Sequence, residues 1–203
     1  NFKTFDVNLL HGVTASGKTE IYIKLLEQYI KEGKQVLFLL PEIALTTQLV
    51  QRLTAYFGNE VAVFHSKYTN NERIEVWNQV LENSPKAKVV IGVRSALFLP
   101  FSDLGCIIVD EEHEQTFKQN DPSPRYHARD AAIVLAKQHG AKVVLGSATP
   151  SLETYYNVQS NKYGLTELKV RYGNVVLPEI KLVDLKDKYF RKKMSGHFSD
   201  ELL

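Results

Sequence analysis

The sequence predicts an α/β protein with a doubly wound, mostly parallel β-sheet. Short apolar runs alternate with helix-like segments along most of the chain, as in repeated strand–helix–strand units. Residues 35–40 are almost wholly apolar, which is typical of a parallel strand covered by helices on both faces. Polar clusters follow several of these runs, at the strand ends where open α/β sheets bind their ligands.

Each predicted element comes from a short pattern. Strands are expected from apolar runs at residues 7–10, 35–40, 61–64, 88–92, 106–109 and 142–145. Helices are expected over residues 18–32, 46–57, 69–82, 125–138 and 151–160. Residues 114–127 are expected to be irregular, and Pro124 suits the first position of the helix that follows them.

Two of these helices have a clear apolar face in the sequence. The first is predicted to carry Ile21, Leu25 and Tyr29 on one side, and the third Ile74, Trp77 and Leu81.

The pattern changes near residue 165. Residues 168–170 and 180–183 are predicted to be further strands, and residues 184–203 a charged, solvated connector. We therefore divide the sequence into a lobe of residues 1–167 and a terminal segment of residues 168–203.

Composition restricts the possible functions. The chain has 203 residues and is 44% hydrophobic, with 25 basic and 23 acidic residues, so an anion-binding surface must be local. Cys106 is the single cysteine, which excludes an internal disulfide and a cysteine-based zinc cluster, and we expect it to be buried. No apolar stretch approaches the roughly 18 residues of a membrane span, and no secretory leader is visible. We expect a reduced, cytoplasmic location and no membrane partner.

A glycine-framed loop carries the strongest chemical signal. It fits the phosphate-binding pattern of Gly, four free positions and Gly-Lys-Ser/Thr, through Gly12, Val13, Thr14, Ala15, Ser16, Gly17, Lys18 and Thr19. A predicted strand precedes it and a predicted helix follows, so backbone N–H groups and the helix N-terminus face the same point. Lys18 is expected to contact the outer phosphates of a bound polyphosphate, and Thr19 to offer its hydroxyl to Mg²⁺.

A second cluster, the acidic pair Asp110 and Glu111, follows an apolar strand. Two adjacent carboxylates at a strand end repel each other unless a cation offsets their charge, so the pair implies a metal. One acid is expected to hold Mg²⁺ while the other orients or deprotonates the attacking water.

Three stretches resemble motifs I, II and III of the superfamily 2 helicases, namely residues 12–19, 110–113 and 147–149. Residues 41–46, 92–96 and 125–130 narrow this resemblance to the replication-restart helicases of the bacterial primosome, over about residues 8–185. The resemblance implies the first RecA-like lobe, a P-loop NTPase fold, of an ATP-driven 3′→5′ DNA helicase.

The resemblance also implies roles for individual residues. Lys18, Asp110 and Glu111 would be catalytic, and Thr19 and Asp110 would bind the metal. The coupling residues, which would link the nucleotide state to the affinity for DNA, are His113, Ser147 and Thr149. DNA contacts would come from Pro41, Glu42, Thr46, Arg94, Ser95, Phe117, Lys118, Arg125 and Tyr126. Aromatic rings in such a set stack on bases, and basic neighbours hold the backbone.

The sequence departs from the family pattern in some places. Ala15 stands where the family usually has glycine, and nucleotide binding is expected to survive if its φ is negative. Phe117 replaces a more usual tyrosine. The second lobe, the amino-terminal DNA-binding region and the zinc-binding insertion of the family do not occur in this sequence, so we expect a piece of a longer protein. Alone, it is expected to bind ATP weakly and hydrolyse it poorly.

The family's partners are forked and single-stranded DNA, primosome proteins and single-strand-binding protein, and a monomer is expected. Two other functions remain open: a different superfamily 2 translocase, such as a restriction or remodelling motor, and a non-catalytic module that clamps DNA and recruits partners. The phosphate loop alone would also suit a kinase, which residues 110–113 and 147–149 disfavour.

Overall fold

The computed structural model describes residues 2–41, 48–65, 68–174 and 181–202. These residues form two compact units, Asn1–Gly173 and Asn174–Leu203. The strands of the first unit are β1 (Val7–Gly12), β2 (Gln35–Leu39), β3 (Val61–Phe64), β4 (Val89–Gly92), β5 (Leu104–Asp110), β6 (Lys142–Ser147) and β7 (Gly164–Leu168). Its helices are α1 (Lys18–Lys31), α2 (Gln48–Phe57), α3 (Asn70–Leu81), α4 (Ala128–His139) and α5 (Leu152–Gln159).

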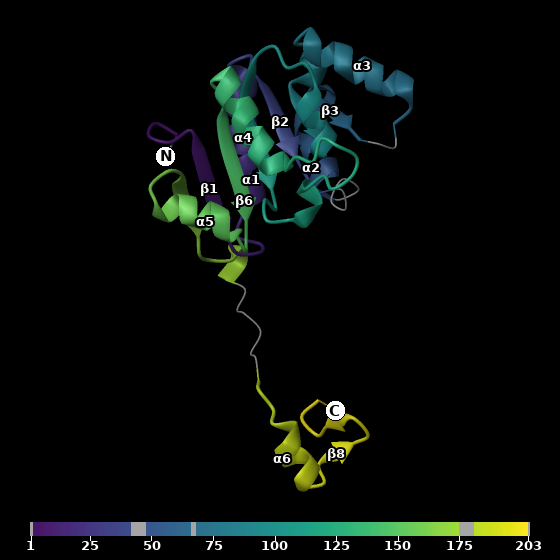
Figure 1. Cartoon of the computed structure of the whole chain (residues 1–203), viewed down its shortest axis with the longest axis vertical. Coiled ribbons are helices and arrows are strands. Elements are labelled where there is room, and N and C mark those ends of the chain that lie inside the picture. The colour runs from purple at the N-terminus through teal and green to yellow at the C-terminus, as the bar shows by residue number, and fades with distance from the viewer. Residues whose placement is uncertain (1, 42–47, 66–67, 175–180, 203) are drawn as a thin grey trace. The chain divides into compact units, whose positions relative to one another are not determined.

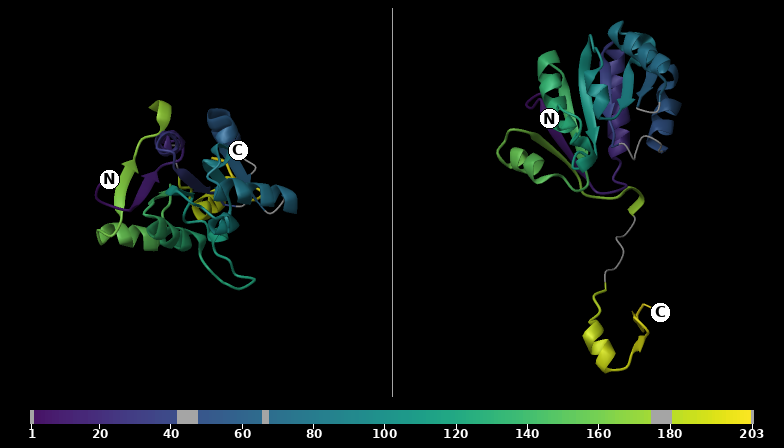
Figure 2. Two further views of the ribbon diagram at one scale, coloured as in Figure 1. Left: turned by 90° about the horizontal axis from the view of Figure 1, so that it is seen from above. Right: turned by 45° about the vertical axis from the view of Figure 1, so that its right-hand side comes forward.

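The seven strands form one sheet in the order β3-β4-β2-β5-β6-β1-β7, and the paired strands run parallel (Figure 1). Alternate side chains of β2 enter two separate cores. Leu37 packs with residues of α3 and α4, whereas Phe38 packs with residues of α1 and α2. Helices therefore cover both faces, as Figure 2 shows from above, and the predicted doubly wound fold is confirmed.

Three adjacent strands bring the predicted motifs to one edge of the sheet. Asp110 at the end of β5 is in register with Gly146 of β6, and Ser147 of β6 is in register with His11 of β1. Because parallel strands end on the same side, the phosphate loop after β1 and the acidic segment after β5 lie at this common edge.

The buried faces of two helices differ from the predicted ones. In α1 the fully buried side chains are Tyr22, Ile23 and Leu26, and the predicted Ile21, Leu25 and Tyr29 are only partly buried beside them. In α3 the buried side chains are Val76 and Val80, whereas Ile74, Trp77 and Leu81 are exposed. Each helix has apolar residues on more than one side, and packing against the sheet selects which side is covered.

The segment before α4 is an ordered loop, and the prediction that the helix starts at Pro124 is wrong. Lys118 pairs with His127 as an isolated antiparallel bridge, and Gln119 N–H donates to the Tyr126 carbonyl at 2.9 Å. The Gln119 side chain also donates to the Pro124 carbonyl at 3.2 Å. These contacts hold the chain out of helical geometry until α4 begins at Ala128.

The predicted strands beyond residue 167 are also wrong where the structure describes them. Leu168 ends β7, and residues 169–170 and 181–183 form no strand; residue 180 lies outside the described part. The second unit contains α6 (Leu185–Phe190) and a hairpin of β8 (Met194–Ser195) and β9 (Phe198–Ser199). Lys188 of α6 contacts Asp200 at 2.9 Å, so the charges expected in a connector join a small folded unit.

None of the described helices combines the length and apolarity needed to cross a bilayer.

Candidate active site

The phosphate loop leaves β1 at Gly12 and enters α1 at Lys18. A Cβ on Gly12 would come within 2.5 Å of the Ser16 hydroxyl and 3.0 Å of Lys18 Cγ, so only glycine fits there. Gly17 has φ 93°, a left-handed conformation that favours glycine. The Lys18 ammonium donates to the Gly12 carbonyl at 2.8 Å, which folds this charge back over the loop.

Ala15 corrects one expectation, because its φ is 61° and not negative. An alanine in the left-handed region costs roughly 1–2 kcal/mol, and its carbonyl accepts a hydrogen bond from Tyr172 N–H at 2.8 Å. The Ser16 hydroxyl is buried with no hydrogen-bond partner among the described residues. Buried polar groups are normally satisfied, so this hydroxyl is a donor available to a ligand in the loop.

A cavity of about 610 Å³ adjoins the loop. Its lining residues are Ala15, Gly17, Thr19, Glu20, Arg52 and Tyr172. Arg52 of α2 forms an ion pair with Glu20 of α1 at the side of this cavity. Thr19 thus faces an open space next to the loop, where a phosphate and its cation have room.

The acidic pair is anchored from α1. The hydroxyl of Tyr22, the fifth residue of α1, donates to Asp110 Oδ1 at 2.8 Å. Burial raises the pKa of Asp110, against the opposing effects of the Tyr22 hydrogen bond and the Lys18 charge. Burial and the Asp110 charge raise the pKa of Glu111, again against Lys18. Lys18 therefore acts electrostatically on both carboxylates, and a bound cation would favour their ionised forms.

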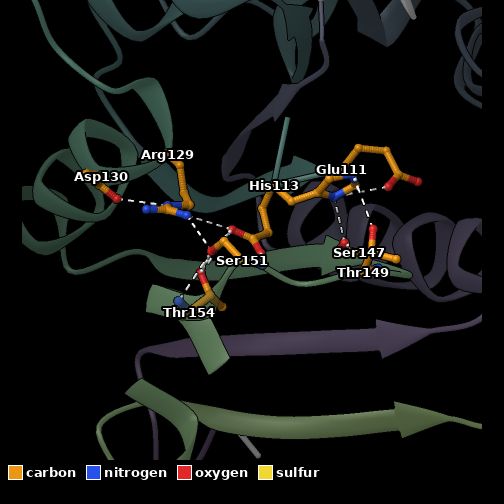
Figure 3. A network of polar contacts seen from close by, with 9 residues as sticks. Glu111, His113, Arg129, Asp130, Ser147, Thr149, Ser151 and Thr154 are labelled. Atoms are coloured by element: carbon orange, nitrogen blue, oxygen red, sulfur yellow. Dashed lines mark hydrogen bonds and ion pairs between the residues drawn. The ribbon is translucent and has the colours of Figure 1, made fainter. Parts of the chain in front are cut away.

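Glu111 has an unusual backbone conformation, with φ 51°. Its carboxylate Oε2 lies 3.6 Å from Nδ1 of His113. The same ring nitrogen lies 2.8 Å from the buried Ser147 hydroxyl, and Nε2 lies 3.4 Å from Thr149 Oγ1 (Figure 3). Thr149 N–H also donates to Ser147 Oγ at 2.9 Å. The three predicted coupling residues are thus in contact with one another and reach the acidic pair.

The segments predicted to contact DNA are brought together in part. Arg94, in a 3₁₀ turn after β4 (Arg94–Phe98), donates to the Lys118 carbonyl at 2.9 Å. The Lys118 ammonium in turn donates to the Arg125 carbonyl at 3.1 Å. The rings of Phe98 and Tyr126 meet edge to face, with centroids 5.2 Å apart. Ser95 belongs to the same turn as Arg94 and Phe98, so this surface joins basic groups to the exposed ring of Phe98 and the partly buried ring of Tyr126.

Phe117 does not belong to this surface, which corrects the stacking role expected for it. The residue is 0% exposed and packs in the core that contains α4. Phe98, which the sequence reading did not single out, is 59% exposed. Pro41 is buried at the end of β2, and Glu42 and Thr46 lie outside the described residues.

Sequence reasoning also missed Tyr22, Glu112 and Arg129. Tyr22 falls within a helix full of apolar residues, and nothing local marks its hydroxyl as a partner of Asp110. Glu112 and Arg129 stand inside stretches that carried the family resemblance, and they form a buried ion pair at 3.0 Å. The expectation that Cys106 is buried is confirmed, and burial raises the pKa of its thiol.

The sheet order, the glycine loop after β1 and the acidic pair after β5 define a RecA-like helicase lobe. The chain belongs to the DEAD/DEAH box helicase family, whose family model matches residues 4–158.

Sequence relatives indicate which kind of helicase this chain resembles. The chain is 46% identical over 197 residues to the replication restart protein PriA of Bacillus subtilis, covering 97% of this chain and 24% of that relative. It is 50% identical over 191 residues to PriA of Haemophilus influenzae, covering 94% of this chain and 26% of that relative. The resemblance to replication-restart helicases is thereby confirmed, and the chain spans about a quarter of the length of these relatives.

Solved structures support the fold. A structure of RecG bound to a three-way DNA junction aligns with a TM-score of 0.57 and 20% identity, over 87% of this chain and 22% of that chain. The Mss116p DEAD-box helicase domain 2 bound to an RNA duplex aligns with a TM-score of 0.58 and 13% identity, over 84% of this chain and 65% of that chain. At these identities the likeness is one of fold.

Proposed function

We propose that this chain is the ATP-binding motor lobe of a DNA helicase that moves 3′→5′ and restarts stalled replication forks. The observation that carries the proposal is the hydrogen bond from Tyr22, on the helix that starts in the phosphate loop, to Asp110. It links the helix that follows the phosphate loop to the carboxylate of Asp110, the proposed metal ligand. The similarity to PriA supports the choice of substrate and process.

The residues present fit ATP and Mg²⁺. The close approach at Gly12, the left-handed turn at Gly17 and the unpartnered Ser16 hydroxyl suit a polyphosphate, whose outer groups Lys18 would contact. Thr19 and Asp110 would hold the cation, directly or through water. Bound there, Mg²⁺ would neutralise charge on the transferring phosphoryl group.

Glu111 is the proposed base that orients and deprotonates the attacking water. His113 lies between Glu111 and the Ser147 hydroxyl, so a change at the nucleotide can pass to the loop after β6. Thr149 contacts the same histidine and completes this link. The surface that contains Arg94 and Tyr126 would bind single-stranded DNA, through contacts to the DNA backbone and stacking on the bases.

The remaining assignments belong to the parent protein. We propose that residues 1–167 act as the first lobe and that residues 168–203 lead toward a second lobe, which supplies an arginine for the phosphoryl transition state. Zinc would bind in the parent protein outside this chain. The parent would act as a monomer in the bacterial cytoplasm, on forks and single strands, with primosome proteins and single-strand-binding protein. Without the second lobe, the isolated chain should bind ATP weakly and turn it over poorly.

The test uses the full-length parent, with ATPase and unwinding assays on forked and plain duplex DNA. We expect DNA-stimulated ATPase that Glu111→Gln and Lys18→Ala each reduce to a small residual rate, about a hundredfold or more below that of the parent, and unwinding that favours forks. Unchanged turnover in Glu111→Gln would favour the DNA-clamping module. Translocation without unwinding would favour another superfamily 2 motor.

A further inference from the structure

The carboxylate of Glu112 is fully buried next to the proposed catalytic acid. Its Oε1 accepts from Ser151 N–H at 2.8 Å, and its Oε2 accepts from Arg129 Nη1 at 3.0 Å. The hydroxyls of Ser151 and Thr154 also donate to Oε2, at 3.1 and 2.9 Å. Figure 3 shows this network on the opposite side of the segment from His113. Glu112 thus binds α4 and the start of α5 at the same time.

Several charged and hydrogen-bonding groups hold the Glu112 carboxylate in one orientation. Arg129 Nη1 donates to Ser151 Oγ at 2.6 Å as well, and its Nε donates to Asp130 at 2.9 Å. An ionised carboxylate is buried only where charged and hydrogen-bonding partners offset its lost hydration. Charge-assisted bonds of this kind are strong and directional, so they fix the orientation of the groups that they join.

The backbone at Glu111 needs such an anchor. A left-handed φ is unfavourable for glutamate, and it persists only where the surroundings impose it. On one side Asp110 is fixed by its register with Gly146 and by Tyr22. On the other side Glu112 N–H donates to the Gly146 carbonyl at 3.0 Å, and its side chain is held by the buried network. Glu111 therefore lies between two fixed residues.

We propose that the Glu112–Arg129 pair is a positioning device that holds Glu111 in its left-handed conformation and so aims its carboxylate at the attacking water. This inference rests on the proposed function, because it assigns Glu111 the role of water activation. Neither Glu112 nor Arg129 touches the reacting atoms; both act through the backbone of Glu111. The pair also makes α4 part of the site, since Arg129 lies one residue after the first residue of that helix.

The test measures DNA-stimulated ATPase and nucleotide affinity in the full-length parent. Glu112→Gln keeps the shape of the side chain and removes its charge, and we expect kcat to fall about tenfold or more while nucleotide affinity stays within about twofold. Arg129→Lys keeps the positive charge and loses the planar fork, and we expect a smaller loss of the same kind. Asp6→Asn is the control, since it removes the charge of an exposed carboxylate paired with Lys142, outside this network; its kcat should stay near that of the parent.

A double-mutant cycle separates positioning from stability. In a Glu111→Gln background, adding Glu112→Gln should change the residual turnover by less than about twofold, since the positioned group is already lost. Losses that multiply independently, or a Glu112→Gln variant with the parent's kcat, would overturn the proposal. If Glu112→Gln does not fold, Arg129→Lys in the same cycle decides the question.

The cycle also distinguishes failure of the proposed function from failure of the positioning role. Full turnover in Glu111→Gln alone would refute the proposed function itself. Loss of turnover in Glu111→Gln together with full turnover in Glu112→Gln and Arg129→Lys would refute only the positioning role.

Discussion

The hydroxyl of Tyr22 lies 2.8 Å from Oδ1 of Asp110, and so connects the helix of the phosphate loop to the acid proposed to bind the metal. Tyr22 is fully buried and Asp110 is partly buried, and burial, followed by the charge of Asp110, raises the pKa of Tyr22. The phenol therefore stays protonated and donates. Because a hydrogen bond to a charged group is worth about 1.5–3 kcal/mol, this contact holds the Asp110 carboxylate in place.

Tyr22→Phe should weaken the use of Mg²⁺ by the parent protein. Without the hydroxyl, Asp110 loses a fixed partner, so we expect a several-fold higher Mg²⁺ concentration for half-maximal ATPase and a stability loss of about 1–3 kcal/mol. A Mg²⁺ titration of ATPase and a urea titration measure the two effects. Tyr29→Phe makes the same chemical change further along α1 and should leave the Mg²⁺ requirement unaltered. An equal effect of both variants would contradict the role of Tyr22.

Gly146→Ala should disturb the Tyr22–Asp110 hydrogen bond, because Gly146 lies next to both side chains. A Cβ at this position would overlap the Tyr22 hydroxyl and lie 3.1 Å from Asp110 Oδ1. We expect a loss of about 1–3 kcal/mol from overpacking, measured by denaturant unfolding. Combining Gly146→Ala with Tyr22→Phe removes the overlapping oxygen and should cost less than the sum of the two single changes. Additive losses would show that the glycine is required for another reason.

Position 15 should tolerate glycine and reject β-branched residues. With φ 61° at Ala15, glycine removes the left-handed penalty, while valine adds a much larger one. We expect nucleotide affinity in the order Gly, then Ala, then Val, with Ala15→Gly gaining at most about fivefold from roughly 1 kcal/mol of relieved strain. Fluorescence titration with a nucleotide analogue measures the series. Tighter binding by Ala15→Val than by the parent would contradict the observed conformation.

The proposed nucleic-acid surface and the core should respond differently to loss of an aromatic ring. Tyr126→Ala and Phe98→Ala should each weaken single-stranded DNA binding by about 1–3 kcal/mol, if their rings stack on bases. Phe117→Ala should lower the free energy of unfolding by about 3–5 kcal/mol, because its ring fills the core. DNA-binding isotherms and denaturant unfolding of the same three variants test this division. A selective binding loss in Phe117→Ala would restore the stacking role first expected for it.

Arg94→Ala should reduce the salt dependence of DNA binding. If its guanidinium contacts a phosphate, the slope of log affinity against log salt should fall by about one. The substitution also removes the bond to the Lys118 carbonyl, so loop order contributes to the result. Lys34→Ala, which breaks a remote ion pair with Asp103, is the control and should leave the slope unchanged.

Local patterns were sufficient for the phosphate loop, the strands β1 to β6 and the placement of Asp110 at a strand end. A parallel sheet needs continuous apolar strands, and a phosphate loop needs glycine where the backbone turns left-handed or passes close to other atoms. Both requirements are visible within a few residues. The motif residues were therefore predictable, although the φ of Ala15 was not, because the backbone around it overrides the preference of alanine.

Contacts between distant residues required the tertiary structure. The buried side of α3, the start of α4 at Ala128 and the burial of Phe117 depend on which surfaces meet when the sheet is covered. Apolar side chains on more than one side of a helix leave that choice open until packing is known.

The sequence by itself determined the chemistry of this protein, namely a phosphate loop, an acidic pair and the strand–helix alternation that carries them to one edge of a sheet. The tertiary structure decided which residues hold that chemistry in place: Tyr22 on Asp110, and Arg129 on Glu112. These partners lie far apart in the sequence, and their bonds are strong because folding buries them away from water, a property that no local pattern encodes.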